Sequence, residues 1–412
     1  MAIQAPKLLV GFFLFVFLVS LLSVLGNEVP QEPVFLLETA KGTTRSGPVV
    51  SLEKDWSIRL GGTKPARAAG GEVVSLRRVG TPLPAFPSEE QVLFANGDRL
   101  PGRVLGWTGE RLHFQAVLGN GQELDLPLMA LSVVWFVPPD DVDDPEWLIR
   151  KMATEKRRRD QVWLRNGDLV EGIVTGMDRQ VLRLEVARKP VEAALNKVAA
   201  VALSSALARL PQSAQPFGRV VVTRGGRLSL AEAHADGSVL TGRTFFGAEV
   251  RLSWNEVVAL DLRQGRAVYL SDLKPRAYQF TSYLGEGQWP YVPDGSVDGH
   301  DLILGGSTFD KGLGMHSASR LSYDLEGRYQ RFEARVGLDD RAGRDGRARI
   351  GVLVDGKPQD LGGDPELTRT DGPRLIQVNL AGARELTLVV EFGRRGDVQG
   401  RVDWADARLI KD

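Results

Sequence analysis

Apolar and polar residues alternate in short runs along most of the chain, and glycine-containing turns separate the runs. Leu321–Leu325 (LSYDL) and Phe332–Leu338 (FEARVGL) show the pattern, with an apolar residue at every second position. A period of two over four to eight residues is typical of β-strands that bury one face. The pattern therefore predicts an all-β protein.

One strand-rich unit recurs four times before the last third of the chain, over residues 33–80, 91–138, 161–210 and 218–265. The likeness is clearest where Val92–Val104 (VLFANGDRLPGRV) corresponds to Val162–Val174 (VWLRNGDLVEGIV). The fourth unit has Leu230 in place of a second glycine. The first three units carry two glycines five positions apart, at Gly42/Gly47, Gly97/Gly102 and Gly167/Gly172.

The repeated unit is expected to fold as two hairpins and a closing strand. Asn96-Gly97 and Asn166-Gly167 lie between alternating runs, and Asn-Gly favours a tight hairpin in which both residues have positive φ. A chain of such units predicts tandem small β-barrels of the SH3-like or Sm-like kind, because closure removes the sheet edges. The pattern resembles, in a generic way, Sm-like repeats of bacterial envelope proteins.

A connector helix is predicted at residues 139–160, between the second and third units. Its acidic residues come first and Lys156–Arg159 come last, which complements a helix dipole. We expect a solvated surface helix, and the alternative is a docking site for an acidic polymer. Segments 81–90 and 208–217 are linkers by their proline content.

The N-terminal residues 1–26 are predicted to be a signal peptide or a membrane anchor. Lys7 precedes an uncharged apolar run over residues 8–25, which is typical of a secretory signal but is also long enough to span a bilayer. Either reading makes the protein secreted or places it in the periplasm or cell envelope, and contact with a membrane is expected only through residues 8–25 if they stay uncleaved. An exported chain without cysteine favours a bacterial source.

Composition excludes several classes of function. The 52 basic and 52 acidic residues cancel, so no nucleic-acid partner is expected. Cysteine is absent and the four histidines lack helical i, i+4 spacing, which argues against a Cys- or His-based metal centre. No G-x-S-x-G, P-loop or H-E-x-x-H motif occurs, so the chain is expected not to be an enzyme.

The last third of the chain carries a series of motifs in a fixed order. They include Tyr269–Leu273 (YLSDL), Leu302–Gly306 (LILGG), Lys311–Leu325 (KGLGMHSASRLSYDL), Val352–Gln359 (VLVDGKPQ) and Asp403–Asp406 (DWAD). In order and wording these segments resemble the NPCBM family of carbohydrate-binding modules. The resemblance implies a jelly-roll-type, galactose-binding-like β-sandwich over residues 268–412, with a glycan, galactose-type by family analogy, as ligand. The alternative is a cell-envelope scaffold whose repeats assemble with protein partners and whose sandwich binds no sugar.

The candidate sugar-binding residues are aromatic and polar side chains expected on loops of the sandwich. Aromatic rings offer a flat face to the C–H groups of a sugar, and polar side chains bond its hydroxyls. Each has a purely structural alternative, such as a core tryptophan or a histidine that only holds a loop. The candidates are Trp289, Tyr291, His316, Asp339, Asp340, Arg341 and Trp404.

No cofactor is expected, apart from the structural calcium ion that galactose-binding-like folds often hold. Asp294–Gly299 imitates the start of an EF-hand loop, but Gly305 stands where the bidentate carboxylate belongs. The sequence therefore assigns no calcium ligands. Arg341–Arg349 and Arg394-Arg395 would meet an anionic glycan or lipid headgroup, or they are solvated hairpin tips.

Overall fold

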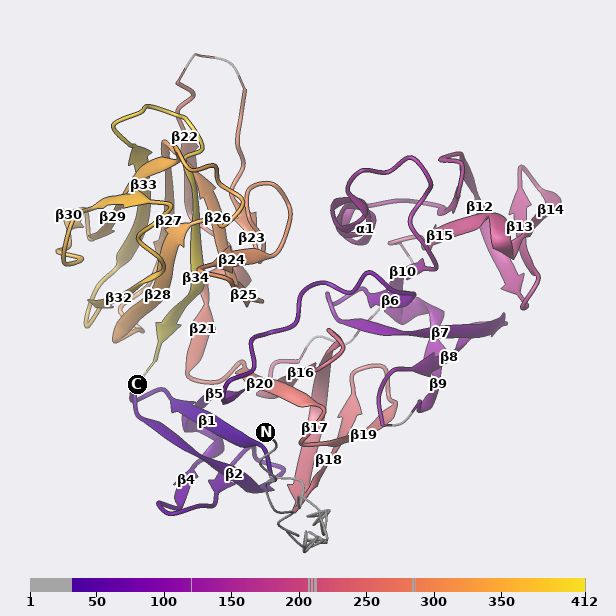
Figure 1. Cartoon of the computed structure of the whole chain (residues 1–412), viewed down its shortest axis with the longest axis horizontal. Helices are drawn as coiled ribbons and strands as arrows, with labels where there is room; N and C mark the ends of the chain where they lie inside the picture. Colours follow the sequence, from indigo (N-terminus) through magenta and orange to yellow (C-terminus); the bar gives the residue numbers. More distant parts are fainter. Residues whose placement is uncertain are drawn as a thin grey trace, which may run out of the picture. The chain divides into compact units, whose positions relative to one another are not determined.

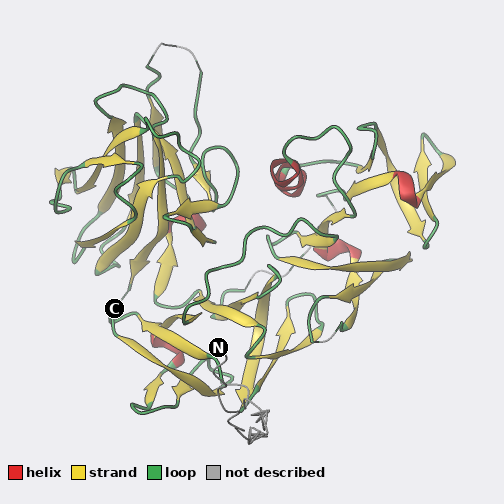
Figure 2. Cartoon of the chain, viewed as in Figure 1, coloured by secondary structure: helices red, strands yellow, loops and turns green. Residues whose placement is uncertain are grey.

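The computed structural model describes residues 32–411, apart from residues 120, 207, 209, 211, 212, 284 and 286. The apolar run at residues 8–25 lies outside the described residues. None of the helices in the described part is long and apolar enough to cross a membrane. Strands make up most of the described chain, as Figure 2 shows in yellow.

The first two repeat units each consist of five strands, with a short 3₁₀ turn before the fifth (Figure 1). In the first unit they are β1 (Val34–Thr39), β2 (Thr44–Leu52), β3 (Ile58–Leu60), β4 (Ala66–Ala68) and β5 (Val73–Arg78). In the second they are β6 (Gln91–Phe94), β7 (Arg99–Thr108), β8 (Arg111–Ala116), β9 (Glu123–Pro127) and β10 (Leu131–Trp135).

The last two units repeat the same five-strand order. In the third unit the strands are β11 (Asp160–Leu164), β12 (Leu169–Met177), β13 (Val181–Val186), β14 (Lys189–Ala194) and β15 (Val198–Ala202). In the fourth they are β16 (Phe217–Val222), β17 (Arg227–Asp236), β18 (Val239–Thr244), β19 (Glu249–Ser253) and β20 (Val257–Arg263).

The fifth strand of each unit has two antiparallel partners. It pairs with the first strand of its own unit, as β5 does with β1 and β15 with β11. Its other edge pairs with the fifth strand of another unit, so that β5 joins β20 and β10 joins β15. The prediction of barrels that stand alone without free edges is therefore wrong. The closing strands join the first unit to the fourth and the second to the third, and β7 meets β17 at Arg99 and Arg227, which connects the two pairs into one network of 20 strands. Their near-continuous apolar sequence, for example Val198–Ala202, fits strands buried on both faces.

The Asn-Gly turns differ from the predicted geometry. Gly97 has φ 82°, whereas Asn96 is not among the described residues with positive φ. The Gly97 N–H donates to Phe94 O at 3.0 Å, and the Phe94 N–H donates to Asp98 O at 2.8 Å. Asn96 caps the turn by accepting the Asp98 N–H at its Oδ1 at 3.1 Å. Such a turn needs one left-handed residue rather than two.

The second repeated glycine lies where two strands approach closely. A Cβ at Gly102 would overlap the carbonyl oxygen of Gln115 and lie 2.5 Å from the Phe114 ring. In the fourth unit Leu230 of β17 occupies this position, and the small residue is instead Gly242 on the partner strand β18. A Cβ at Gly242 would lie 2.7 Å from Leu230 Cδ1. The spacing of the glycines therefore reflects packing inside each unit.

The connector helix is shorter than the predicted 139–160. Helix α1 spans Pro145–Thr154, and its N-cap Asp144 accepts the Trp147 N–H at 3.0 Å. Its apolar face packs on Val133 and Trp135 of β10 through Leu148, Ile149 and Met152. The basic run lies beyond the helix, and Arg157 is buried with its Nη1 donating to Leu203 O at 3.2 Å. Lys156–Arg159 therefore do not form the last turn of the helix, contrary to the prediction.

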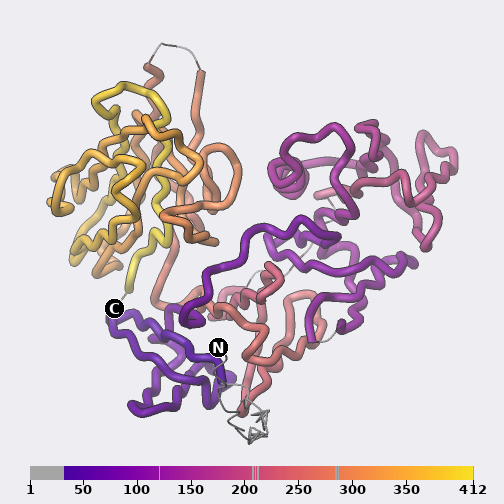
Figure 3. Tube along the Cα trace, viewed as in Figure 1, coloured from indigo at the N-terminus to yellow at the C-terminus, as the bar shows by residue number. Residues whose placement is uncertain are grey.

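The chain passes directly from β20 through β21 into a C-terminal sandwich of two antiparallel sheets (Figure 3). One sheet contains β21 (Ala267–Tyr269), β23 (Val292–Pro293), β26 (Gly312–His316), β28 (Arg331–Leu338), β32 (Arg374–Asn379) and β34 (Arg401–Ile410). The other contains β22 (Ala277–Phe280), β27 (Ser319–Asp324), β29 (Arg347–Val354), β30 (Lys357–Pro358), β31 (Glu366–Thr368) and β33 (Glu385–Phe392). A hairpin of β24 (Leu302–Leu304) and β25 (Ser307–Phe309) stands apart from both sheets.

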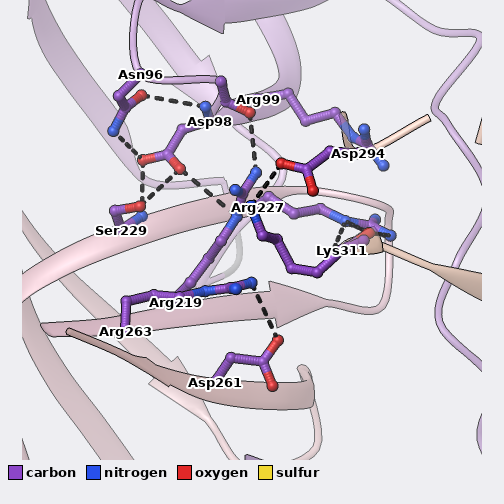
Figure 4. Close-up of polar contacts among 12 residues, drawn as sticks. Asn96, Asp98, Arg99, Arg219, Arg227, Ser229, Asp261, Arg263, Asp294 and Lys311 are labelled. Carbon is purple, nitrogen blue, oxygen red and sulfur yellow. Dashed lines mark hydrogen bonds and ion pairs between the residues drawn. The ribbon is translucent and has the colours of Figure 1, made fainter. Parts of the chain in front are cut away.

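Buried charged side chains link the sandwich to the repeats. Arg227 of β17 donates to both carboxylate oxygens of Asp310, at 3.0 to 3.2 Å. Figure 4 shows the surrounding polar contacts, including Lys311 against Asp294 at 2.5 Å. The repeats and the sandwich therefore share polar contacts that neither would form alone.

Candidate functional site

Several loops meet at one end of the sandwich because the strands that carry them are paired there. The last residue of β26, His316, lies opposite Arg401, the first residue of β34. On the other side of β34, Leu338 at the end of β28 lies opposite Val402. Phe280, the last residue of β22, lies opposite Ser319. The described residues of the segment after β22 therefore share this end with the loops 317–318, 339–346 and 393–400, and we call it the loop face.

Trp289 is a half-buried aromatic side chain of the loop face. Its ring stacks on the His316 imidazole, with centroids 4.8 Å apart and planes 7° from parallel. His316 is only 4% exposed, and Phe280 meets its ring edge-on at 6.3 Å. His316 therefore lies beneath Trp289, and it can act on a ligand only by positioning that ring.

The position of His316 is fixed by the two loops beside it. Its Nδ1 lies 2.7 Å from Ser317 O and 3.3 Å from Asp397 Oδ1. The Ser317 hydroxyl donates to the same Asp397 oxygen at 2.9 Å. A Cβ at Gly400 would overlap Ser317 Oγ, so the loops are closely interlocked. These contacts hold the platform for Trp289 rigidly.

Tyr291 helps to hold the segment that carries Trp289 against the sandwich core. It is half-buried and packs against the sandwich core, with its ring centroid 5.2 Å from that of Tyr278. The Tyr278 hydroxyl in turn donates to the carbonyl oxygen of Trp289. The two tyrosines therefore fix the backbone under Trp289.

Three polar residues that the sequence did not identify as candidates lie around His316, the residue on which Trp289 stacks. Asp298 pairs with Arg401, and both side chains keep about a fifth of their surface exposed. Asp397 is 28% exposed beside the His316 ring. Partly exposed carboxylates and a guanidinium are suited to bonding sugar hydroxyls. Arg401 could have been identified from the sequence, because it begins a strand directly after a glycine-rich loop.

Four predicted site residues have other roles, and two of them are buried. Trp404 is 0% exposed in the sandwich core and Asp339 is 1% exposed, so neither reaches a ligand, which corrects the prediction. Asp340 accepts the backbone N–H groups of Gly305 and Gly306, which makes it part of a turn. Arg341 extends toward helix α1, with its Nη2 3.7 Å from Glu146 Oε2.

The described acidic residues do not fit a calcium site. In the part of the chain that the structure describes, no group of three or more His, Asp or Glu side chains is placed to hold a metal. Asp294 is held by Lys311, and Asp298 by Arg401. Burial, together with the neighbouring Asp339 carboxylate, raises the pKa of Asp403 well above its usual value.

Two adjacent arginines of the predicted basic tips, Arg394 and Arg395, have acidic partners within the sandwich. Arg395 pairs with Asp345, and Arg394 Nε lies 3.1 Å from Glu366 Oε2. These pairs use much of the charge that would otherwise meet an anionic ligand at the hairpin tips.

Comparison with known proteins gives the sandwich a family. The family model described as "NPCBM/NEW2 domain" matches residues 266–410. A Renibacterium salmoninarum protein, named a candidate endo-alpha-N-acetylgalactosaminidase, is 34% identical over 113 residues, which cover 27% of this chain. The chain spans 7% of the length of that relative.

Two solved structures are also similar to this chain. One is CBM51 from Clostridium perfringens GH95 in complex with methyl-galactose, with 29% identity, a TM-score of 0.31, and coverage of 35% of this chain and 99% of that one. The other holds tandem CBM51 modules of the Streptococcus pneumoniae family 98 glycoside hydrolase, with 14% identity, a TM-score of 0.31, and coverage of 92% and 88%. The match of the family model decides the assignment, and residues 266–410 are an NPCBM/NEW2 domain.

Proposed function

We propose that this protein binds glycans through the loop face of its C-terminal sandwich, with Trp289 as the ring on which a sugar stacks. The stacking of Trp289 on the buried His316 carries the proposal. An indole held flat in this way offers a sugar a preformed surface, which lowers the entropy lost on binding.

Galactose-type sugars are the first ligands to test. The Renibacterium protein is matched across 113 residues and its name specifies an N-acetylgalactosaminide. The polar groups around His316 suit a neutral sugar, since Arg401 and Asp298 neutralise each other and still expose oxygen and nitrogen atoms.

The proposal covers binding without catalysis, in an exported protein. The acidic side chains around His316 are committed to neighbours, Asp298 to Arg401 and Asp397 to Ser317 and His316. A glycosidase would instead need two carboxylates free to act on either side of the scissile bond. Export follows from the predicted signal or anchor at residues 8–25.

A glycan array probed with the whole chain tests the proposal. We expect binding to galactose- or N-acetylgalactosamine-terminated glycans, and Trp289→Ala should abolish it while leaving the circular dichroism spectrum unchanged. Trp163→Ala is the matched control, because it removes another half-buried indole, on β11 of the third repeat unit. Equal binding by wild type and Trp289→Ala would refute the assignment. If the folded wild-type protein bound none of the neutral glycans, the loop face would not be a neutral-sugar site, and a scaffold role of the repeats would be favoured.

A further inference from the structure

A second ligand site is suggested by an open cleft between helix α1, the β6–β7 hairpin and the sandwich. Its volume is about 610 Å³, within the range of small-molecule sites. His300 Nε2 lies 2.6 Å from Asp144 Oδ2, and Arg150 pairs with Asp301, so the walls are joined. We call this the junction cleft; the lining residues used below are Phe86, Arg99, Trp147, Arg150, Lys151 and Asp301.

Trp147 gives the junction cleft an exposed aromatic surface. It is 43% exposed although it lies on the helix that packs against β10. Its Cδ1 is 3.3 Å from the position of a Cβ at Gly299, so that only a glycine lets the sandwich loop approach the ring edge. Lys151, one turn further along the helix, lies over a face of this ring with its Nζ 4.9 Å from the centroid, so a sugar that stacks on that face must displace the ammonium group toward its own oxyanion.

The carboxylates that line the junction cleft are already paired. Asp301 pairs with Arg150, and Asp310 with Arg227. Asp294 lies 2.5 Å from the Lys311 ammonium group. Each of these carboxylates therefore forms an ion pair with one cation, and other positive groups of the cleft have no such ion pair among the described residues.

Arg99 and Lys151 are those positive groups, since neither forms an ion pair within 4.0 Å among the described residues. Arg99 is 7% exposed; its Nε donates to Gly225 O at 3.1 Å, and its Nη2 has no hydrogen-bond partner in the described structure. Its guanidinium lies 4.4 Å from the centroid of the Phe86 ring. Burial and the neighbouring Arg227 cation lower the pKa of Arg99 to about 9, while the Asp301 and Asp310 carboxylates act in the opposite direction.

An aromatic face beside two cations that form no ion pair within 4.0 Å among the described residues suits one kind of ligand. A sugar ring stacks on an indole, and a carboxylate or sulfate on that sugar gains from a nearby ammonium or guanidinium group. A neutral sugar would gain the first contact only. We propose that the junction cleft binds an acidic sugar unit, bearing a carboxylate or sulfate, with Trp147 under the ring and Lys151 at the oxyanion.

This site is separate from the loop face, and it rests on the proposed function only in taking a glycan as the ligand. Calorimetric titration of the whole chain tests it with matched probes. Glucuronate against glucose isolates the carboxylate, and N-acetylgalactosamine 6-sulfate against N-acetylgalactosamine isolates the sulfate. Inorganic sulfate measures what the anion alone contributes. Whichever acidic sugar binds identifies the oxyanion.

We expect saturable binding of at least one acidic sugar, tighter than its neutral counterpart and tighter than inorganic sulfate. Lys151→Gln should weaken that binding about tenfold or more, as for loss of a charge-assisted hydrogen bond. Trp147→Ala should also weaken it, and Trp289→Ala should leave it unchanged. Lys156→Gln is the matched control, because it removes an exposed charge from the same basic segment outside the cleft.

Four results would overturn the inference. They are the absence of saturable binding by both acidic sugars, equal affinity for the neutral counterparts, equal affinity for inorganic sulfate, and equal losses in Lys151→Gln and Lys156→Gln. Lys151 is exposed, so its variant is expected to fold. Binding of neutral glycans that depends on Trp289, together with any of these results, would refute the junction cleft and leave the proposed function intact.

Discussion

The ion pair between Arg227 and Asp310 offers a direct test of how the sandwich is held to the repeats. Arg227 is 0% exposed, and its guanidinium bonds both oxygens of Asp310 as well as the carbonyl of Pro84 at 2.7 Å. Asp310→Asn keeps the shape of the side chain but removes its charge, so Arg227 would stay buried without a counter-ion. Breaking one partner of a buried pair costs about 3–5 kcal/mol.

Urea unfolding followed by tryptophan fluorescence measures this cost as a change in the free energy of unfolding. The matched control is Asp345→Asn, whose partner Arg395 is 55% exposed, and its expected cost is below about 1 kcal/mol. A loss under 1 kcal/mol in Asp310→Asn would refute the reasoning, because the pair would then behave like a surface contact.

The pH dependence of the same variant checks the electrostatic cause. Burial acts to raise the pKa of Asp310, but the charge of Arg227 outweighs it, so the pKa lies below its ordinary value of 3.8. A lowered folded-state pKa gives stability that is present above the unfolded-state value and is lost as pH falls through the folded-state value. We therefore expect the unfolding free energies of wild type and Asp310→Asn to differ most above about pH 4 and to converge in stronger acid.

Three further substitutions test other parts of the account. Asp403→Asn should increase stability at neutral pH, because the raised pKa of Asp403 means that the wild-type protein loses stability as pH rises above the unfolded-state pKa. Thermal unfolding at pH 4 and pH 7 measures the difference, and a variant less stable than wild type at pH 7 would contradict the prediction. Trp404→Ala should lower the free energy of unfolding, measured in urea, by about 3–5 kcal/mol because the ring is fully buried. A near-neutral effect would indicate that Trp404 is exposed. Gly102→Ala should lower the free energy of unfolding by about 1–3 kcal/mol or more, because the added Cβ meets the neighbouring strand. The control Gly71→Ala has open space around its Cβ and should be nearly neutral. Equal melting temperatures of the two variants would contradict the close approach at Gly102.

The strands of the protein could be predicted from the sequence because alternation is a local signal. The repeat units and the sandwich motifs follow from it, and the family match at residues 266–410 agrees with the predicted module. The joining of closing strands across units could not be predicted, because a run such as Val198–Ala202 shows burial on both faces without naming the partner.

The candidate site was harder to predict, since burial depends on neighbours from distant segments. Trp404 lies on β34, a central strand between β26 and β28 whose residues are buried on both faces, so a period of two gave no information about exposure. His316 is in the right place, but its role beneath Trp289 arises from a contact between two loops. Asp397 carries no motif that would have identified it.

Isothermal titration of the strongest array glycan into wild type, Trp289→Ala and Trp289→Phe is the measurement that tests the central claim most directly. If Trp289 is the ring on which the sugar stacks, alanine should reduce affinity at least about tenfold and phenylalanine should restore part of it. His316→Ala should weaken binding through the position of Trp289. Unchanged affinity in Trp289→Ala, with the fold intact, would contradict the assignment of the loop face as the glycan site.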